Sequence, residues 1–101
     1  MEKILTVVVP SYNAEAYLKE DIPTFLDERI LEDLEILIVN DGSKDGTGRT
    51  GREFQQKYPE TIRVIDKENG GHGSTINVGI REATGTYFRV VDADEDRKSV
   101  V

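Results

Sequence analysis

The chain of 101 residues is long enough for one domain with a modest core, and its 37% hydrophobic and 33% charged residues are ordinary for a soluble globular protein. Its 20 acidic and 13 basic residues give a net charge of −7, which makes nucleic acids and anionic membranes poor partners. The absence of cysteine excludes disulfides and thiolate metal sites, and it fits a cytoplasmic location. No apolar run approaches the roughly 20 residues that span a bilayer, and the N-terminal segment lacks the basic start and cleavage site of a signal peptide.

The first predicted elements are a strand, a helix and a second strand. Residues 4–9 form a continuous apolar run rich in β-branched residues, which is typical of a buried strand, and we expect Pro10 to end it. Residues 14–30 have the apolar spacing of a helix, broken or bent near Pro23. A second strand is predicted over residues 34–40.

The second half of the chain continues the same alternation of helices and strands. A helix that Ser43 or Asp45 could cap is predicted to run to about residue 58, and a strand follows over 61–66. A further helix is predicted over 74–85, with Ser74 as a possible cap and Gly85 as its stop. The last predicted element is a strand over 86–92.

The order of these elements predicts an α/β fold, a Rossmann-like parallel sheet with βαβαβαβ order, in a single domain over 1–101. Ligand sites of such sheets lie at the carboxyl ends of the strands. A polar cluster follows each of the four strands, and these clusters occupy residues 11–13, 41–43, 66–73 and 92–94. The sequence therefore predicts a binding site along this edge of the sheet.

A glycine pattern after the second strand at first suggests dinucleotide binding. Gly46, Gly48 and Gly51 satisfy G-x-G-x-x-G, and Asp66 supplies an acid at the expected distance. However, five residues separate the strand from Gly46, whereas a dinucleotide loop follows its strand directly. We therefore expect turn and helix glycines, although a glycine inside a helix costs about 1 kcal/mol relative to alanine.

Asp92 and Asp94 end the last predicted strand with a spacing that sends both carboxylates to one side if the strand continues. Two hard oxygen ligands suit Mg²⁺ or Mn²⁺, with diphosphate oxygens completing the octahedron. A solvated acidic loop is the competing interpretation. A calcium-binding loop is disfavoured because Arg97 replaces its turn glycine, and an aspartate-nucleophile phosphatase is disfavoured because Glu95 and Asp96 do not match its motif.

Three other polar residues leave more than one role open. His72 is the only histidine, and it could either stabilise its glycine-rich loop or contact a ligand. Tyr12 and Asn13 could be turn residues, but they are also residue types that stack on a base and hydrogen-bond it.

Together these motifs resemble the nucleotide-binding half of a family 2 glycosyltransferase with the GT-A fold. The matching segments, in order and spacing, are TVVVPSYNAEAYL, LEILIVNDGSKDGT and ENGGHGSTINVGIREATGTYFRVVDADED. They cover nearly all of the chain from residue 4 to residue 96. The resemblance implies transfer of a sugar, with inversion, from a nucleotide-diphosphate sugar (a UDP-sugar is typical) to an unidentified acceptor, with Mn²⁺ or Mg²⁺ as the cofactor.

The resemblance also implies which residues hold the nucleoside. Pro10, Tyr12 and Asn13 would line the base pocket, with Glu15 near the ribose or the base. Asp41 would accept a hydrogen bond from the base, typically from N3–H of uracil.

On the diphosphate-sugar side, the resemblance implies that Gly70, Gly71 and Asn77 border the ligand. Asp92 would face the ribose and the sugar, and Asp94 would hold the divalent metal on the diphosphate. A metal at that position acts as a Lewis acid that stabilises the leaving group.

The chain departs from the family in its length. The catalytic base of such enzymes, an aspartate or glutamate, lies in a second half, whereas this chain stops at Val101, seven residues after Asp94. We therefore expect the catalytic base beyond Val101 and assign it to no residue of this sequence. The expected result is a truncated domain that binds a nucleotide sugar weakly and transfers little or no sugar by itself.

Two alternatives to a glycosyltransferase half remain open. A non-catalytic nucleotide-binding module is the main one, and a dinucleotide-dependent enzyme is a weaker one. We also expect residues 86–91 to form an exposed sheet edge that drives self-association. A longer protein could be membrane-associated.

Overall fold

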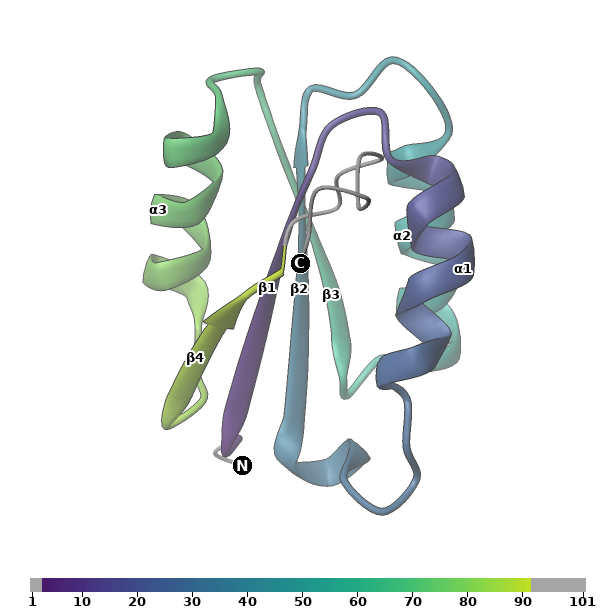
Figure 1. Cartoon of the computed structure of the whole chain (residues 1–101), viewed down its shortest axis with the longest axis vertical. Coiled ribbons are helices and arrows are strands. Elements are labelled where there is room, and N and C mark those ends of the chain that lie inside the picture. The colour runs from purple at the N-terminus through teal and green to yellow at the C-terminus, as the bar shows by residue number, and fades with distance from the viewer. Residues whose placement is uncertain (1–2, 92–101) are drawn as a thin grey trace, which may run out of the picture.

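The computed structural model describes residues 3–91, apart from the side chain of His72, and it shows a sheet with helices on both faces (Figure 1). The elements in chain order are β1 (Leu5–Ser11), α1 (Glu15–Phe25), a 3₁₀ turn η1 (Leu31–Asp33), β2 (Leu34–Asp41), α2 (Thr47–Lys57), β3 (Ile62–Lys67), α3 (His72–Glu82) and β4 (Tyr87–Val90).

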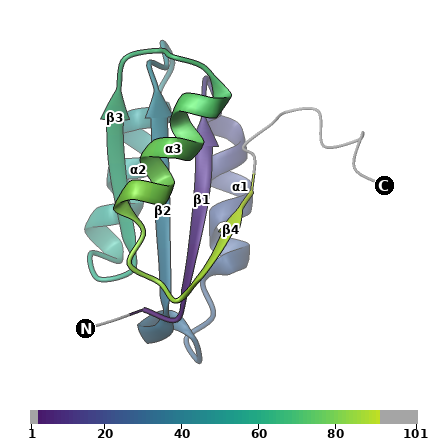
Figure 2. The same ribbon diagram turned by 90° about the vertical axis from the view of Figure 1, so that its left-hand side faces the viewer.

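All four strands are parallel and lie in the order β3-β2-β1-β4. Helices α1 and α2 cover one face of the sheet, and α3 covers the other (Figures 1 and 2). The chain crosses the α3 face from β3 to β4, so the direction of winding reverses between β1 and β4. The predicted fold class is therefore confirmed, and such a reversal is where doubly wound sheets bind ligands. Within residues 3–91, no helix combines the length and apolarity needed to cross a membrane.

The core has two halves because side chains of the central strands alternate between the two faces of the sheet. The larger half lies under α1 and α2, and its fully buried members include Val9, Leu18, Ile22, Ile36 and Ile38. The smaller half lies under α3 and is built on Val8, Leu37 and Val39.

Strand β1 runs through Pro10 to Ser11, so the prediction that Pro10 ends this strand is wrong. The N–H of Val91 donates to the carbonyl of Val8 at 2.9 Å, which shows that this side of β1 faces β4. By the alternation of a strand, Pro10 faces the same way, beyond the last β1–β4 pair of Val8 with Val90. The N–H that Pro10 lacks is thus not needed for the pairing of β1 with β2.

Other boundaries also differ from the prediction. Helix α1 ends at Phe25, two residues after Pro23, so the predicted break near Pro23 is confirmed, and the helix does not continue to residue 30. Helix α3 begins at His72 and ends at Glu82, earlier at both ends than expected, and β4 is shorter than residues 86–92. Gly85 lies beyond α3, where its N–H donates to the Thr6 hydroxyl at 2.8 Å and joins the turn to β1.

The glycine pattern is part of α2, as expected. Gly46 precedes the helix, and Gly48 and Gly51 lie buried inside it. A Cβ on Gly51 would lie 3.0 Å from Cγ2 of Val64, so this glycine lets α2 approach β3 closely. The prediction of turn and helix glycines is therefore confirmed.

Candidate functional site

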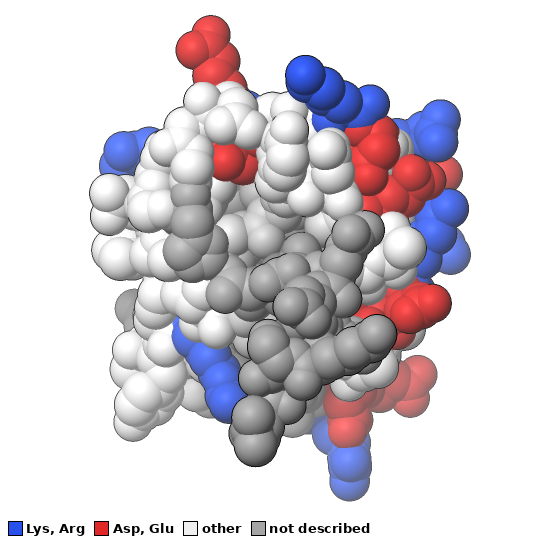
Figure 3. Space-filling view, turned by 45° about the horizontal axis from the view of Figure 1, so that its top comes forward, with Lys and Arg blue, Asp and Glu red and all other residues white. Residues whose placement is uncertain are grey.

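The loops that follow β1, β2 and β3 lie together at the carboxyl edge of the sheet, at the top of Figure 1. Figure 3 shows this edge turned toward the viewer. Lysine, arginine, aspartate and glutamate gather on its right side, over α1 and α2, whereas uncharged residues cover much of the left side. On the face that Figure 3 shows, charged side chains of both signs are therefore concentrated on one side of this edge.

Asn13 joins the loop after β1 to the loop after β2. Its N–H donates to the Ser43 hydroxyl at 2.9 Å, and its side-chain oxygen accepts the N–H of Lys44 at 2.8 Å. Asn13 has φ +49°, in the left-handed region that asparagine tolerates better than most residues. Both its backbone and its side chain are thus used to hold the two loops in one arrangement.

Glu15 completes this connection at the start of α1. Its carboxylate accepts the N–H of Gly46 at 3.1 Å and lies 3.2 Å from Lys19 and 3.8 Å from Arg49. Nearby, Ala14 donates its N–H to the hydroxyl of Thr47 at 2.8 Å. The beginnings of α1 and α2 are therefore joined by hydrogen bonds between residues about 30 positions apart.

Asp45 supports the start of α2 by accepting hydrogen bonds from both the N–H and the hydroxyl of Thr47. Burial alone would raise the pKa of Asp45, but these bonds outweigh it and hold the pKa below its ordinary value. The N-cap of α2 is Gly46, so the prediction that Ser43 or Asp45 caps this helix is wrong: Asp45, one residue earlier, bonds Thr47, and Ser43 bonds Asn13.

Asp41 ends β2 and is only 5% exposed. Its Oδ1 accepts hydrogen bonds from Nζ of Lys67 and from the N–H of Gly70, each at 2.8 Å, and its Oδ2 accepts the N–H of Gly71 at 3.0 Å. The side chain of Asn69 donates to the backbone carbonyl of Asp41 at 3.2 Å. The glycine-rich loop after β3 is therefore folded directly onto Asp41.

The charge of Asp41 is stabilised by these contacts. Burial would raise the pKa of this carboxyl, but the hydrogen bond from Lys67 and those from Gly70 and Gly71 outweigh it, with the Lys67 charge adding to them. The pKa of Asp41 therefore lies below its ordinary value. The result is a charged hydrogen-bond acceptor, almost out of water, at the end of a central strand.

Lys67 is a residue of this edge that sequence reasoning missed. It is paired directly with Asp41 in the register of β2 with β3, which brings the two side chains together. The neighbouring pair of Asn40 with Asp66 is also joined by a side-chain hydrogen bond, at 2.9 Å. An assumed strand register would have revealed Lys67, because it is the one basic residue that falls opposite the strand-end aspartate.

The other predicted nucleotide-binding residues lie on three different elements. Pro10 is buried in β1, and Tyr12 follows that strand with 47% of its surface exposed. Gly70 and Gly71 contact Asp41, whereas Asn77 is exposed on α3. The structure thus brings the predicted residues of three loops together and leaves their contacts with a ligand as predictions.

Three of the sequence predictions fall outside the described residues, which end at residue 91. Asp92 and Asp94 lie in the following segment, and so does Val101, beyond which we expect the catalytic base. The roles of the two aspartates and the place of the base therefore stay predictions. No residue of the described edge is assigned as the base in their place.

The predicted metal rests on Asp92 and Asp94. Between residues 3 and 91, the side chain of His72 left aside, no three histidine, cysteine, aspartate or glutamate residues are grouped as metal ligands. Two carboxylates of the edge are already paired with basic side chains, Asp41 with Lys67 and Asp66 with Arg52, each at 2.8 Å. Among the described loops, Asp41 is therefore a charged hydrogen-bond acceptor and not part of a group of metal ligands.

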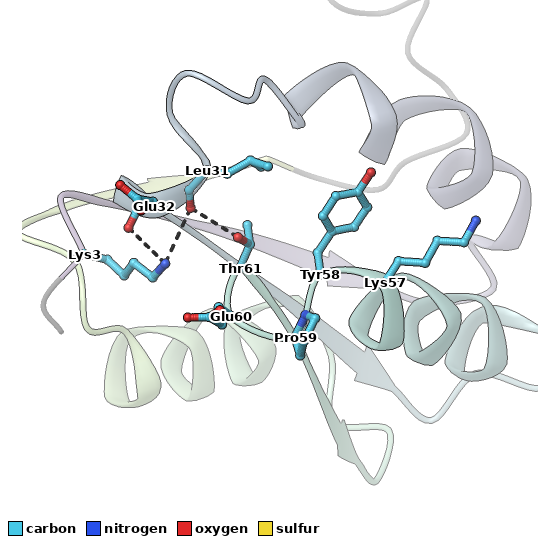
Figure 4. Close-up of a pocket in the computed structure, with 8 residues that line it drawn as sticks. All are labelled: Lys3, Leu31, Glu32, Lys57, Tyr58, Pro59, Glu60 and Thr61. Atoms are coloured by element: carbon cyan, nitrogen blue, oxygen red, sulfur yellow. Dashed lines mark hydrogen bonds between the residues drawn. The ribbon is translucent and has the colours of Figure 1, made fainter.

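A hollow of about 420 Å³ lies at the opposite end of the sheet (Figure 4). There Lys3 donates to the backbone carbonyls of Glu32 at 3.0 Å and Leu31 at 3.5 Å, and the Thr61 hydroxyl donates to Leu31 at 3.1 Å. These bonds tie the chain before β1 and β3 to η1. The hollow contains none of the predicted site residues, and its polar contacts explain it as a junction between elements.

Among solved structures, the chain is similar to the mannosyltransferase PcManGT from Pyrobaculum calidifontis, which was solved with GDP-Man and Mn²⁺. The match has a TM-score of 0.75 and 26% identity and covers 93% of this chain and 28% of that one. It is also similar to S. aureus TarS 1-349 in complex with UDP-GlcNAc, with a TM-score of 0.66 and 28% identity over 90% of this chain and 26% of that one.

Curated protein sequences match this chain at higher identity than the solved structures do. The chain is 40% identical over 95 residues to the uncharacterized glycosyltransferase EpsJ of Bacillus subtilis, a match that covers 94% of this chain and 27% of that protein. It is 37% identical to the minor teichoic acid biosynthesis protein GgaB of the same organism, over 89% of this chain and 10% of that protein. The chain therefore spans about a quarter or less of these relatives. Because residues 6–95 match Glycosyl transferase family 2, the chain belongs to that family.

Proposed function

We propose that this chain binds the sugar donor of a glycosyltransferase, a nucleotide-diphosphate sugar, and that the donor is a UDP-sugar. The observation that carries this proposal is Asp41, a charged and nearly buried acceptor onto which the loop of Gly70 and Gly71 is folded. An acceptor of this kind suits an N–H of a base edge, because charge-assisted hydrogen bonds are strong where water is excluded. Similar solved structures hold GDP-Man or UDP-GlcNAc, which supports a donor of this class.

On the base side, Tyr12 follows β1, which pairs with the strand that Asp41 ends, and it offers an exposed aromatic ring. We expect the ring to stack on the base, a contact worth about 1–3 kcal/mol. Asn13 and Glu15 support this side by holding the two loops together. A loop arrangement set before binding lowers the entropy cost of ordering the site.

On the diphosphate side, we propose that Gly70, Gly71 and Asn77 border the ligand, that Asp92 faces the ribose and the sugar, and that Asp94 holds Mn²⁺ or Mg²⁺. The metal, when bound, supplies a Lewis acid for the diphosphate leaving group. A location in the cytoplasm is part of the same proposal.

Transfer with inversion also needs a general base, and we propose that it is supplied by a segment beyond Val101. None of the carboxylates described above is assigned to that role, since Asp41 and Asp45 are held by hydrogen bonds within the edge. We therefore expect the chain alone to bind its donor and to be inactive in transfer.

Titration calorimetry of the purified chain with UDP, with and without Mn²⁺, tests the proposal. We expect binding that requires Mn²⁺ and that falls about tenfold or more in Asp41→Asn, because a charged hydrogen bond is worth about 1.5–3 kcal/mol. Tyr12→Ala should lower the affinity for UDP by a similar factor and leave the stability of the fold unchanged, because this side chain is exposed.

Asp33→Asn is the matched control for Asp41→Asn, since Asp33 is exposed in η1 at the other end of the sheet. It should bind UDP as the unchanged chain does. No binding of UDP by the folded chain in the presence of Mn²⁺ would contradict the proposed function. Sugar transfer by this chain alone would contradict the expected inactivity.

We further propose that the chain associates with itself through β4. This strand is at the edge of the described sheet, and Tyr87 and Phe88 on it are 66% and 40% exposed. An unpaired edge with exposed aromatic side chains favours pairing with another strand.

A further inference from the structure

We infer that Lys67 is a base-reading residue and that, together with Asp41, it selects a base edge with one N–H between two carbonyl oxygens, as in uracil, over the edge of guanine, which has two adjacent donors. The inference rests on the proposed function, because it concerns the base of the nucleotide donor. It adds a residue and a rule of specificity that come from the contacts of the Asp41–Lys67 pair.

Asp41 can still accept a hydrogen bond from a ligand. An ionised carboxylate has about four lone-pair positions. Three are used, two on Oδ1 by Lys67 and Gly70 and one on Oδ2 by Gly71. No further donor to Oδ2 is found among the residues that the structure describes. Asp41 therefore has room for one donor from a ligand while its own contacts stay in place.

Among the described residues, Lys67 has an unused hydrogen-bond donor next to Asp41. An ammonium group has three N–H donors, and those of Lys67 bond Oδ1 of Asp41 at 2.8 Å and the carbonyl of Glu68 at 2.6 Å. The third donor has no acceptor within the described part of the chain. The side chain is only 16% exposed, and its pairing with Asp41 in the strand register keeps the free donor beside the free acceptor.

Gly70 is part of the same arrangement. A Cβ at this position would lie 2.9 Å from Nζ of Lys67 and 3.0 Å from the hydroxyl oxygen of Ser74. A side chain on residue 70 would therefore push the ammonium group away from Asp41. The absence of a side chain at Gly70 lets Lys67 lie under the loop.

The Asp41–Lys67 pair fits the edges of uracil and guanine differently. Uracil presents one N–H, at N3, between two carbonyl oxygens, so one acceptor and one neighbouring donor satisfy it. Guanine also presents a carbonyl oxygen, O6, beside N1–H, but its N2 amino group is a second donor adjacent to N1–H, and a carboxylate binds these two donors with both oxygens. With Gly71, Gly70 and Lys67 in place, Asp41 lacks the second acceptor position, so one guanine donor would be desolvated without a partner.

The experiment compares UDP and GDP binding, each with Mn²⁺, in the unchanged chain, Lys67→Met and Gly70→Ala. Methionine keeps much of the length and apolar stem of the lysine but removes its donors and frees a position on Oδ1. We expect the unchanged chain to prefer UDP and Lys67→Met to lose about tenfold in UDP affinity. The ratio of UDP to GDP affinity should fall further, because the variant gains an acceptor for guanine. Gly70→Ala should shift the ratio in the same direction.

Lys57→Met is the matched control, since Lys57 lies at the hollow on the opposite end of the sheet. It removes the same charge and should leave the ratio unchanged. Circular dichroism and thermal melts confirm that each variant is folded. If the role of Lys67 is only structural, Lys67→Met lowers the affinities for UDP and GDP equally. An unchanged ratio of UDP to GDP affinity in folded Lys67→Met would therefore overturn the inference and leave the proposed function standing. No binding of either nucleotide by the unchanged chain would overturn both.

Competition with uridine, which has no phosphate, separates base reading from phosphate binding. If Lys67 reads the base, Lys67→Met should lower the affinity for uridine by the same factor as the affinity for UDP. A loss confined to UDP would place Lys67 on the diphosphate and overturn the inference.

Discussion

Asp41 keeps its negative charge although the side chain is almost completely buried. Burial would raise its pKa, but the hydrogen bonds from Lys67, Gly70 and Gly71 outweigh that effect, so the pKa lies below its ordinary value. A carboxyl with a lowered pKa in the folded state stabilises the fold at pH values above its unfolded pKa of about 3.9. That contribution is lost as the pH falls through the folded pKa.

Asp41→Asn should therefore lose stability at pH 7, by about 2 kcal/mol or more, because it leaves Lys67 nearly buried without its counter-charge. The difference in unfolding free energy between the two chains should shrink as the pH is lowered below about 4. Denaturant unfolding at several pH values measures this difference.

Amide hydrogen exchange measures the hydrogen bonds to the Asp41 carboxylate directly. The N–H groups of Gly70 and Gly71 should exchange faster in Asp41→Asn, since both donate to the carboxylate. The control Asp33→Asn should leave both measurements unchanged. Equal stability of Asp41→Asn and the unchanged chain at pH 7 would show that the ion pair contributes nothing to folding.

At the scale of elements, α3 depends on a close approach to β1. A Cβ on Gly79 would lie 2.5 Å from Cγ1 of Val8, which is fully buried in the centre of the smaller core half. Gly79→Ala should therefore destabilise the fold by about 1–2 kcal/mol, because overpacking exceeds the gain in helix propensity. The midpoint and slope of chemical unfolding measure the change.

Gly73→Ala is the matched control in the same helix, because a Cβ there meets nothing within 4 Å. It should be neutral or stabilise by up to about 1 kcal/mol through helix propensity alone. If both substitutions change stability alike, the distance between α3 and β1 is not set by Gly79.

At the scale of the whole molecule, the free edge of β4 should decide the association state. Residues 87 and 91 donate their N–H groups to β1, so the N–H of Phe88 faces away from β1 toward the open edge. Phe88→Pro should therefore block pairing with another copy while leaving the β1–β4 ladder intact. Light scattering over a range of concentrations measures the mass.

We expect the unchanged chain to exceed the monomer mass at high concentration and Phe88→Pro to remain monomeric. Ile80→Asp is the control, because Ile80 is an exposed apolar residue on α3 rather than on the edge strand. A monomeric mass of the unchanged chain at high concentration would refute self-association.

The alternation of elements and the parallel sheet could be read from the sequence, because apolar runs and helical spacing are local patterns of neighbouring residues. The same patterns placed Asp41 at a strand end and predicted that Gly46, Gly48 and Gly51 are turn and helix glycines. Element boundaries were less predictable. Pro10 lies within β1 because β4 does not extend beside it, which is a property of the neighbouring strand.

The sequence by itself determined the class of fold, the family and the edge at which polar residues follow the strands. Only the tertiary structure decided which of those residues meet. Lys67 reaches Asp41 through the register of β2 with β3, and Asn13 and Glu15 hold the loop after β2 across about 30 positions. Such contacts depend on how whole strands and loops pack against one another, and no local pattern of residues encodes that.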